Sequence, residues 1–504
     1  MMEQLIPIPY RPLLAILCPA IGSIFIVLFG KRPNIRESWT MLASIAQFLI
    51  VFSMVPIVIG GNGEPIKYTL FTAFPSVDFG FSVDAFGLIF AITSSFLWIL
   101  VSSYSIGYMR SLHEHAQTRY YFCFCWAIFG AVGVALSGNL FTMFVFYEIL
   151  TVSTYPLVAH DQTPEALFAG RKYLAYLLTA GGFFLAAVVI TYYFTGTTDF
   201  VTGGIPNLAS EASRTALMAL FALFLLGFMK AAWMPFHSWL PTAMVAPTPV
   251  SALLHAVAVV KAGVFGIVRV VCYIYGVDLM HGLGLGLVLA CLATFTIIVA
   301  NLFALAQDNL KRRLAYSTIN QLSLIIFGVA LLSPEGIEGA MMHIPFHGFM
   351  KITLFMCAGA IIVVSGKKNI SEMAGIGKEM PVTMIAFTIG ALGMCALPPT
   401  AGFITHHLFV HGCEEAGGTM SFFPYVLLIA AILDVMYFFP IIYTAFFAKS
   451  EGSSGSKINE APLFMLVPIA ITATVSIIFF FYPDLFHISE LVETAVSSLG
   501  GVHP

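Results

Sequence analysis

Two lysines stand out because they lie within one apolar stretch, residues 227–268, GFMKAAWMPFHSWLPTAMVAPTPVSALLHAVAVVKAGVFGIV. A lysine at the centre of a membrane helix costs about 2.5–3.5 kcal/mol, so Lys230 and Lys261 must face protein or water. Irregular backbone is tolerated at membrane depth only where it packs in protein or lines a cavity. The stretch therefore predicts a polar passage inside a helical membrane protein. Four prolines interrupt it: Pro235, Pro241, Pro247 and Pro249.

Glu148 is the single acidic residue of the segment LFTMFVFYEILTVSTYPL and lies near its middle. An ionisable group inside a membrane indicates function by default, and Tyr155 at i+7 shares its helix face. The distance from Glu148 to Lys230 would control whether the buried lysine is protonated. The alternatives are an acid buried neutral or held by Thr151, and a static ion pair that only fixes helix packing.

Histidines accompany the lysines. His255 and Lys261 are six residues apart and do not share one stripe of an ideal α-helix, so we predict a π-bulge between them. In MMHIPFHGFMKITLF, His343, His347 and Lys351 fall at i, i+4 and i+8 and form one polar stripe. Zinc is the rival interpretation of this histidine pair. No acid or third ligand lies close in the same helix, which favours a hydrated proton relay.

A second interrupted segment, CALPPTAGFITHHLFVH at 395–411, contains His406, and Asp434 lies in the middle of a later apolar segment. A histidine titrates near neutral pH and is suited to passing a proton toward an outward-facing exit. For the neighbouring His407 and His411, an interfacial position without function is the alternative. Two interrupted helices at corresponding places in two halves are typical of inverted repeats around a site at the membrane midplane.

The elements that position these residues are apolar. Of the 504 residues, 59% are hydrophobic and 9% are charged, a composition typical of an integral membrane protein. The net charge of −3 gives no basic excess for nucleic acid. The eight cysteines lack zinc spacing, and no iron–sulfur, haem, flavin or nucleotide motif is present. We expect no cofactor and no metal site, and no cleaved signal peptide.

Fourteen apolar stretches are long enough to span a membrane. They lie near 12–29, 38–59, 86–108, 120–136, 138–158, 172–194, 214–232, 248–275, 281–303, 312–332, 337–365, 381–411, 424–447 and 461–483. We expect an all-α membrane fold with two inverted five-helix repeats and with helices 7 and 12 broken. The expected divisions are 1–119 (helices 1–3), 120–275 (helices 4–8), 281–447 (helices 9–13) and 461–504 (helix 14 and tail), with long loops at 60–85 and 195–213.

Basic residues predict the orientation, because they accumulate in cytoplasmic loops. Three lie on the side of the N-terminus and of the loops after even-numbered helices: Arg11, which precedes the first helix, Lys67 and Arg214. Both termini should therefore face away from the cytoplasm. Fifteen lie in loops after odd-numbered helices: Lys31, Arg32, Arg36, Arg110, Arg119, Arg171, Lys172, Lys311, Arg312, Arg313, Lys367, Lys368, Lys378, Lys449 and Lys457.

Three quoted segments carry a resemblance: residues 227–263, DNLKRRLAYSTINQLS at 308–323, and HIPFHGFMKITLF at 343–355. They resemble the antiporter-like membrane subunits of Mrp-type sodium/proton antiporters, respiratory complex I and membrane-bound hydrogenases, over roughly helices 3 to 13. The D subunit of Mrp is most similar, because the chain stops soon after helix 14 and the longer members carry a C-terminal lateral helix.

The resemblance implies roles for Glu148, Lys230, Lys261 and His347 as the glutamate of helix 5, the lysines of helices 7 and 8, and a histidine of the central axis. One position departs from the pattern. His406 stands where related chains have lysine or glutamate in helix 12, and Asp434 is the hypothetical source of the missing charge.

The expected function is proton translocation in a multisubunit Na⁺/proton antiporter of the inner (plasma) membrane, with protons, Na⁺, lipid and other membrane subunits as partners. The alternative is a proton-pumping subunit of a redox-driven complex that resembles NADH:quinone oxidoreductase or membrane-bound hydrogenase. A third is an inactive scaffold. In each case the chain has no catalytic chemistry of its own, and redox chemistry would belong to partner subunits.

Overall fold

The computed structural model describes residues 6–61, 63–448 and 458–500, and its regular structure is almost entirely helical. The N-terminal part contains α2 (Arg11–Leu28), α3 (Pro33–Phe52), α4 (Val55–Gly60) and α5 (Ala85–Ser111). The next part contains α6 (Gln117–Leu136), α7 (Leu140–Val158), α8 (Pro164–Thr195), α9 (Leu208–Glu211), α10 (Arg214–Gly227), α11 (Trp239–Thr242), α12 (Thr248–Ala252) and α13 (Val259–Arg269). The remainder contains α14 (Val277–Leu283), α15 (Leu285–Leu305), α16 (Leu310–Ala330), α17 (Pro334–Ser365), α18 (Ile376–Glu379), α19 (Pro381–Met394), α20 (Ala401–Ala416), α21 (Phe423–Phe446), α22 (Leu463–Phe481) and α23 (Ile488–Ser498).

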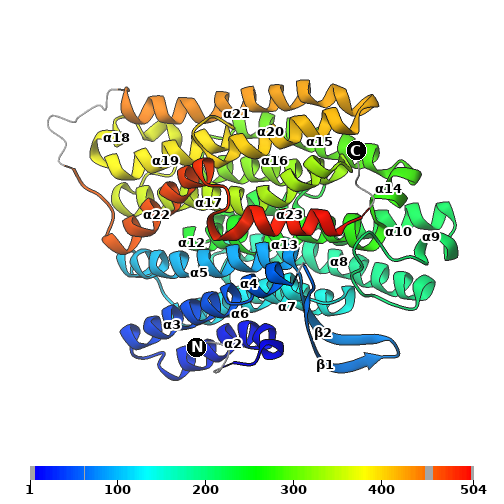
Figure 1. The fold of residues 1–504 in the computed structure, drawn as a ribbon. Coiled ribbons are helices and arrows are strands. Elements are labelled where there is room, and N and C mark those ends of the chain that lie inside the picture. Colours follow the sequence, from blue (N-terminus) through cyan, green and yellow to red (C-terminus); the bar gives the residue numbers. More distant parts are fainter. Residues whose placement is uncertain (1–5, 62, 449–457, 501–504) are drawn as a thin grey trace.

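Eleven of the described helical segments are long and apolar enough to cross a membrane. The other three predicted spans are α16, which carries many polar residues, and the two interrupted spans built from α10 and from α19 with α20. Figure 1 shows these helices running side by side, with α2 and α3 at one edge and α21 at the opposite edge. The predicted fold, about fourteen spans with two broken, is confirmed.

The helices α8 and α17 begin and end in the same way. Each is 32 residues long, begins with a Ser or Thr cap followed by Pro–Glu, and ends at a left-handed glycine, Gly196 or Gly366. The cap hydroxyls of Thr163 and Ser333 accept hydrogen bonds from Ala166 and Gly336. The two helices are thus started and stopped by the same local chemistry.

Both interrupted spans break at prolines. The α-helix of α10 ends at Gly227, a short 3₁₀ turn (Met229–Ala231) follows, and α11 begins only at Trp239. Lys230 therefore lies in the break itself, which corrects the expectation that helix continues to 232 and that Lys230 precedes the break. Residues 395–400 separate α19 from α20 in the same way. The bonds Met234–Pro235 and Pro398–Pro399 are cis.

The predicted π-bulge is confirmed. Residues Leu253–Val257 form a π-helical turn that contains His255 and separates α12 from α13. A second π-helical segment, Val270–Tyr275, follows α13. At the end of α13 the buried Arg269 pairs with Asp84, whose carboxylate also accepts a hydrogen bond from Gly87 at the start of α5. This pair fixes α13 against α5 at one end of the molecule.

Two elements were not predicted. The expected loop at 60–85 contains an antiparallel hairpin of β1 (Ile66–Phe74) and β2 (Val77–Val83), which projects from the helical body in Figure 1. The C-terminal segment forms α23, which runs alongside the helices of the bundle in Figure 1 and contacts α4, α5 and α17. Its buried residues are Ile488, Leu491, Val492 and Ala495. Lys449 and Lys457, which we assigned to a basic loop, lie outside the described residues.

Candidate functional site

Lys230 is completely buried and is held by α7. Its Nζ donates a hydrogen bond to the carbonyl oxygen of Tyr147, at 2.5 Å, and lies 3.2 Å from the centroid of the Tyr147 ring. A cation over an aromatic face is attracted by the ring quadrupole. The Tyr147 hydroxyl donates to Gly227 O at 3.0 Å. One tyrosine therefore fixes both the end of α10 and the lysine that follows it.

Glu148 follows Tyr147 in α7, and its half-buried carboxylate lies against Gly181 of α8. A Cβ on Gly181 would come within 2.3 Å of Glu148 Oε1, so glycine makes room for the carboxylate. Glu148 Oε1 has no hydrogen-bond partner among the described residues. Thr151 donates to Tyr147 O, at 3.2 Å, and does not hold the carboxylate. In the part of the chain that is described, no ion pair joins Glu148 to Lys230, so the static-pair alternative is not the arrangement found.

The Lys230 turn packs directly on α13. A Cβ on Gly263 would lie 2.2 Å from Ala231 N and 2.6 Å from Lys230 C, so this contact requires glycine. Lys261 lies two residues before Gly263 and is also completely buried. The close approach of the two segments sets the position of Lys230 relative to Lys261.

Lys261 begins a polar network that crosses to α17. Its Nζ is 2.7 Å from Nδ1 of His347, and the ring of His347 stacks on that of His343 with centroids 5.8 Å apart. His343 Nδ1 is 2.8 Å from Thr405 Oγ1 in α20, and its Nε2 is 3.0 Å from Gln321 Oε1 in α16. The His343/His347 stripe predicted from the sequence thus faces α13, α16 and α20 together.

The network continues to Asp434 in α21. Gln321 Nε2 lies 3.4 Å from Asp434 Oδ2, and Asn320 Nδ2 donates to Oδ1 at 2.9 Å. The Tyr437 hydroxyl also donates to Asp434. Nearby, Lys351 donates to Ser317 Oγ at 2.5 Å and reaches Leu314 O at 3.4 Å. Asp434 is almost wholly buried, so these donors replace water around its carboxylate.

Five predicted residues are not joined to this network by hydrogen bonds among the described residues: Glu148, Lys230, His255, Lys351 and His406. His255 is buried with neither ring nitrogen partnered, and its ring lies 4.6 Å from that of Phe355. His406 is half-buried, and its neighbour Thr405 reaches His343 instead. His407 and His411 are exposed, and His411 Nδ1 lies 3.6 Å from Glu414.

Sequence reasoning missed the neutral members of the site. Asn320 and Gln321 could have been found from the sequence, since two adjacent amides inside a predicted span are costly unless they are hydrogen-bonded. Tyr147 and Thr405 could not have been found in this way, because tyrosine and threonine are ordinary residues of membrane helices. The full set of such residues is Tyr147, Ser317, Asn320, Gln321, Thr405 and Tyr437.

The arrangement suits stepwise proton transfer. Lys230, Lys261, Lys351 and Asp434 are buried in a low-dielectric interior, and Lys261 and Asp434 contact side chains able both to donate and to accept protons. A change of charge at one group alters the protonation free energy of the next, since Coulomb interactions are strong where water is excluded.

Comparison with known proteins identifies the family of the chain. Residues 137–433 match the family described as "NADH:quinone oxidoreductase/Mrp antiporter, TM". The chain is 28% identical to the A1 subunit of the Na⁺/H⁺ antiporter of Staphylococcus haemolyticus (strain JCSC1435). It is 30% identical to the A subunit of the Na⁺/H⁺ antiporter of Alkalihalophilus pseudofirmus (strain ATCC BAA-2126 / JCM 17055 / OF4). Both matches cover 97% of this chain, which spans 63% and 62% of the length of these two relatives.

Two solved structures share the fold. A chain of the membrane-bound sulfane sulfur reductase, an archaeal respiratory membrane complex, aligns with a TM-score of 0.84 at 26% identity, over 97% of this chain and 98% of that one. A chain of the Mrp complex from Dietzia sp. DQ12-45-1b aligns with a TM-score of 0.85 at 21% identity, over 98% and 97%. The family match covers more than half of the sequence, and it contains every lysine, histidine and acid from Glu148 to His406 discussed above. The chain belongs to the NADH:quinone oxidoreductase/Mrp antiporter family of multi-pass membrane proteins.

Proposed function

We propose that the chain translocates protons as an antiporter-like component of a multisubunit Na⁺/proton antiporter. The observation that carries the proposal is the buried row of polar side chains from Lys261 to His347, whose ring stacks on that of His343, and from His343 through Gln321 to Asp434. Polar and ionisable groups are expensive inside a membrane, and a network that joins four helices through them is expected to serve transport. Sodium is proposed from the antiporter relatives.

The direction of transfer follows the order of the charged groups. Protons are proposed to enter near Lys230 and Glu148, to cross by way of Lys261 and the His343/His347/Lys351 stripe, and to leave near Asp434 and His406. Because Lys230 bonds a carbonyl rather than a carboxylate, movement toward or away from Glu148 would alter its protonation.

The test uses the complex purified with its native partners in vesicles containing a pH-sensitive dye. Lys261→Met keeps the volume of the side chain and removes its charge. We expect proton flux to fall by about tenfold or more, the scale on which loss of a positioned proton-transfer group acts. Lys378→Met, at an exposed lysine, is the matched control and should transport normally. Equal flux in both variants, with assembly retained, would favour the scaffold hypothesis.

A redox-driven pump is the second candidate, and the likeness to a chain of an archaeal respiratory complex favours it. Affinity purification in mild detergent followed by mass spectrometry separates the two. Small membrane subunits alone would support the antiporter, and sodium-dependent proton flux would then be measured. Flavin, iron–sulfur or hydrogenase subunits would support the pump instead.

The finer assignments belong to the same proposal. The antiporter relatives reported above are A-type subunits, so the sequence-based assignment to the D subunit of Mrp stays a prediction that the identity of co-purifying proteins will decide. An inner (plasma) membrane location, termini outside the cytoplasm, and the division at 119, 275 and 447 into two five-helix repeats are likewise proposed.

A further inference from the structure

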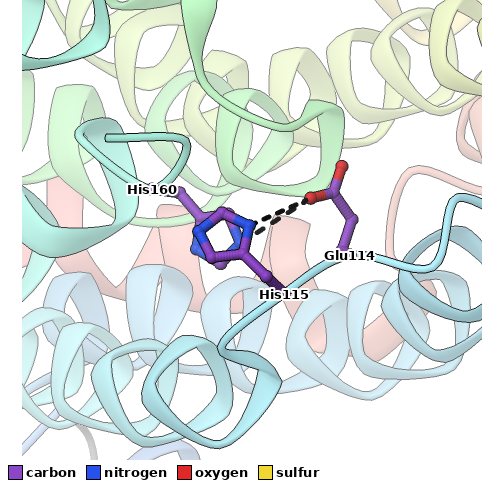
Figure 2. Close-up of side chains that lie close together, drawn as sticks. All are labelled: Glu114, His115 and His160. Carbon is purple, nitrogen blue, oxygen red and sulfur yellow. Dashed lines mark ion pairs between the residues drawn. The ribbon is translucent and has the colours of Figure 1, made fainter. Parts of the chain in front are cut away.

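A group of three possible ligands lies away from the proton network, where two helix connections meet. Glu114 and His115 lie between α5 and α6, and His160 follows the end of α7 (Figure 2). Glu114 Oε2 is 3.9 Å from Nε2 of His160 and 4.0 Å from Nδ1 of His115. All three ligand atoms lie within 4.8 Å of one another. Residues 45 positions apart thus face one point, and Figure 2 shows both rings turned toward the carboxylate.

His160 is the unusual member because it is completely buried and unpartnered. Its side chain has 0% exposure, and neither ring nitrogen has a hydrogen-bond partner among the described residues. A buried polar group without a partner destabilises the fold, so an orphaned imidazole calls for an explanation. The position of His160 is fixed through its backbone, since Arg119 donates to its carbonyl oxygen at 2.9 Å. Its ring lies against the rings of His115 and Tyr120, with centroids 4.7 and 5.9 Å apart, and its Nε2 faces the Glu114 carboxylate.

We propose that Glu114, His115 and His160 bind a divalent transition metal ion of the zinc class. Two imidazole nitrogens and one carboxylate oxygen form a ligand set that zinc accepts, with a fourth position left for water. Zinc–ligand bonds of about 2.0–2.2 Å place tetrahedral ligands roughly 3.4 Å apart. The three side chains must therefore approach by less than about 1.5 Å, and the half-exposed His115 has room to rotate.

Access to the site is provided by a cavity of about 750 Å³ whose lining includes Glu114 and the neighbouring Asp161. Basic side chains, among them Lys311 and Lys368, also line this cavity, so the attraction for a cation comes from the three ligands themselves and not from the cavity as a whole. A fourth ligand would be a water molecule entering from the cavity. A bound ion would tie the α5–α6 connection to the end of α7, the helix that carries Glu148. The expected consequence is a more rigid junction on this side of the molecule.

A second cluster of similar composition serves as the control. Asp484, His487 and Glu490 also lie close together, but all three are partly exposed, and His487 Nδ1 is already 3.0 Å from Glu490 Oε2. Adjacent surface residues that bond one another show no orphaned group. His113, in the same connection as Glu114 and exposed, gives a second control.

The experiment measures Zn²⁺ binding by isothermal titration to the full chain, purified with its partners through a tag without histidine and stripped with a chelator. We expect one equivalent bound, with affinity lowered by about tenfold or more in His115→Ala and Glu114→Gln. His113→Ala and His487→Ala should bind as the unmodified protein does. X-ray absorption at the zinc edge should show nitrogen and oxygen ligands, with two imidazoles and no sulfur.

His160→Ala should also lose binding, and circular dichroism will show whether it folds. If His160→Ala does not fold, His115→Ala still tests zinc binding, because His115 is half-exposed and lies in a connection between helices. No zinc bound at 100 µM (about −5.5 kcal/mol), or equal affinity in His115→Ala and His113→Ala, would overturn the proposal. So would a zinc site lost only in His487→Ala.

Discussion

At the scale of single residues, the buried lysines are stabilised by neutral partners. Lys230 bonds a carbonyl oxygen and a ring, Lys261 bonds a histidine, and Lys351 bonds a hydroxyl. A carboxylate in ion contact would hold each lysine charged, whereas these partners stabilise the charged form less and make its loss less costly. Ready exchange of a proton requires this balance.

Tyr147 tests the balance at Lys230. Tyr147→Phe removes the hydroxyl that donates to Gly227 O but keeps the ring against Lys230, so we expect a loss of about 0.5–1.5 kcal/mol in stability and nearly normal flux. Tyr147→Leu also removes the ring and should reduce proton flux strongly. Thermal unfolding and vesicle flux measure the two effects. Equal flux in both variants would show that the ring does not position the lysine.

Asp434 and His406 are the two residues that the sequence predicts at the proton exit. Asp434 accepts hydrogen bonds from Asn320, Gln321 and Tyr437, whereas His406 has no hydrogen bond in the described network. We therefore expect Asp434→Asn to lower flux by about tenfold or more and His406→Ala to lower it less. Flux is measured between pH 6 and 9. An Asp434→Asn variant that transports normally over this range would refute the proposed role of the carboxylate.

At the scale of elements, close packing joins the Lys230 turn to the Lys261 helix. Gly263→Ala would place a methyl group 2.2 Å from Ala231 N, which forces α13 away from the break. Overpacking of this kind costs about 1–3 kcal/mol, and we also expect flux to fall because the two lysines move apart. Gly282→Ala in α14 is the matched control, since no atom lies within 4 Å of the added Cβ. Similar thermal stability of the two variants would show that the contact is not tight.

The spans were predictable because a membrane helix needs only a long apolar stretch, and α8 and α17 carry strong end signals as well. The hairpin and α23 were missed because each element is much shorter than a membrane span, so a search for long apolar runs passes over them. The π-turn at His255 could be predicted from spacing within one helix. Gln321 and Thr405 could not be placed against His343, because contacts between helices depend on tertiary packing.

At the scale of the whole molecule, two cavities are lined by alternate connections between the predicted membrane spans. The cavity of about 750 Å³ is lined by residues from the connections after predicted helices 3, 5, 7, 9 and 11. A cavity of about 460 Å³ is lined by residues from the connections after predicted helices 2, 4 and 6, from the C-terminal part of helix 8 and from α23. Odd and even connections thus lie at separate ends, as strict alternation across a membrane requires. The first cavity is lined by Lys311, Arg312, Lys367 and Lys368.

This alternation leads to a test of orientation. Basic connections face the cytoplasm, so the larger cavity is expected there and the hairpin outside. We would introduce Lys67→Cys or Lys378→Cys, both at exposed positions on opposite ends, into a Cys291→Ser background that removes the exposed native thiol. A membrane-impermeant maleimide should label Lys67→Cys in right-side-out vesicles and Lys378→Cys only in inside-out vesicles.

The control is the Cys291→Ser chain alone, whose remaining cysteines are buried apart from the half-buried Cys18; any labelling of this chain is subtracted from that of the two variants. The opposite labelling pattern would reverse the orientation, and with it the side from which protons reach Lys230. Labelling of both positions from one side would contradict the alternation itself and require a different number of spans between residues 67 and 378. Cysteine labelling therefore determines the side from which protons reach Lys230 without a transport assay.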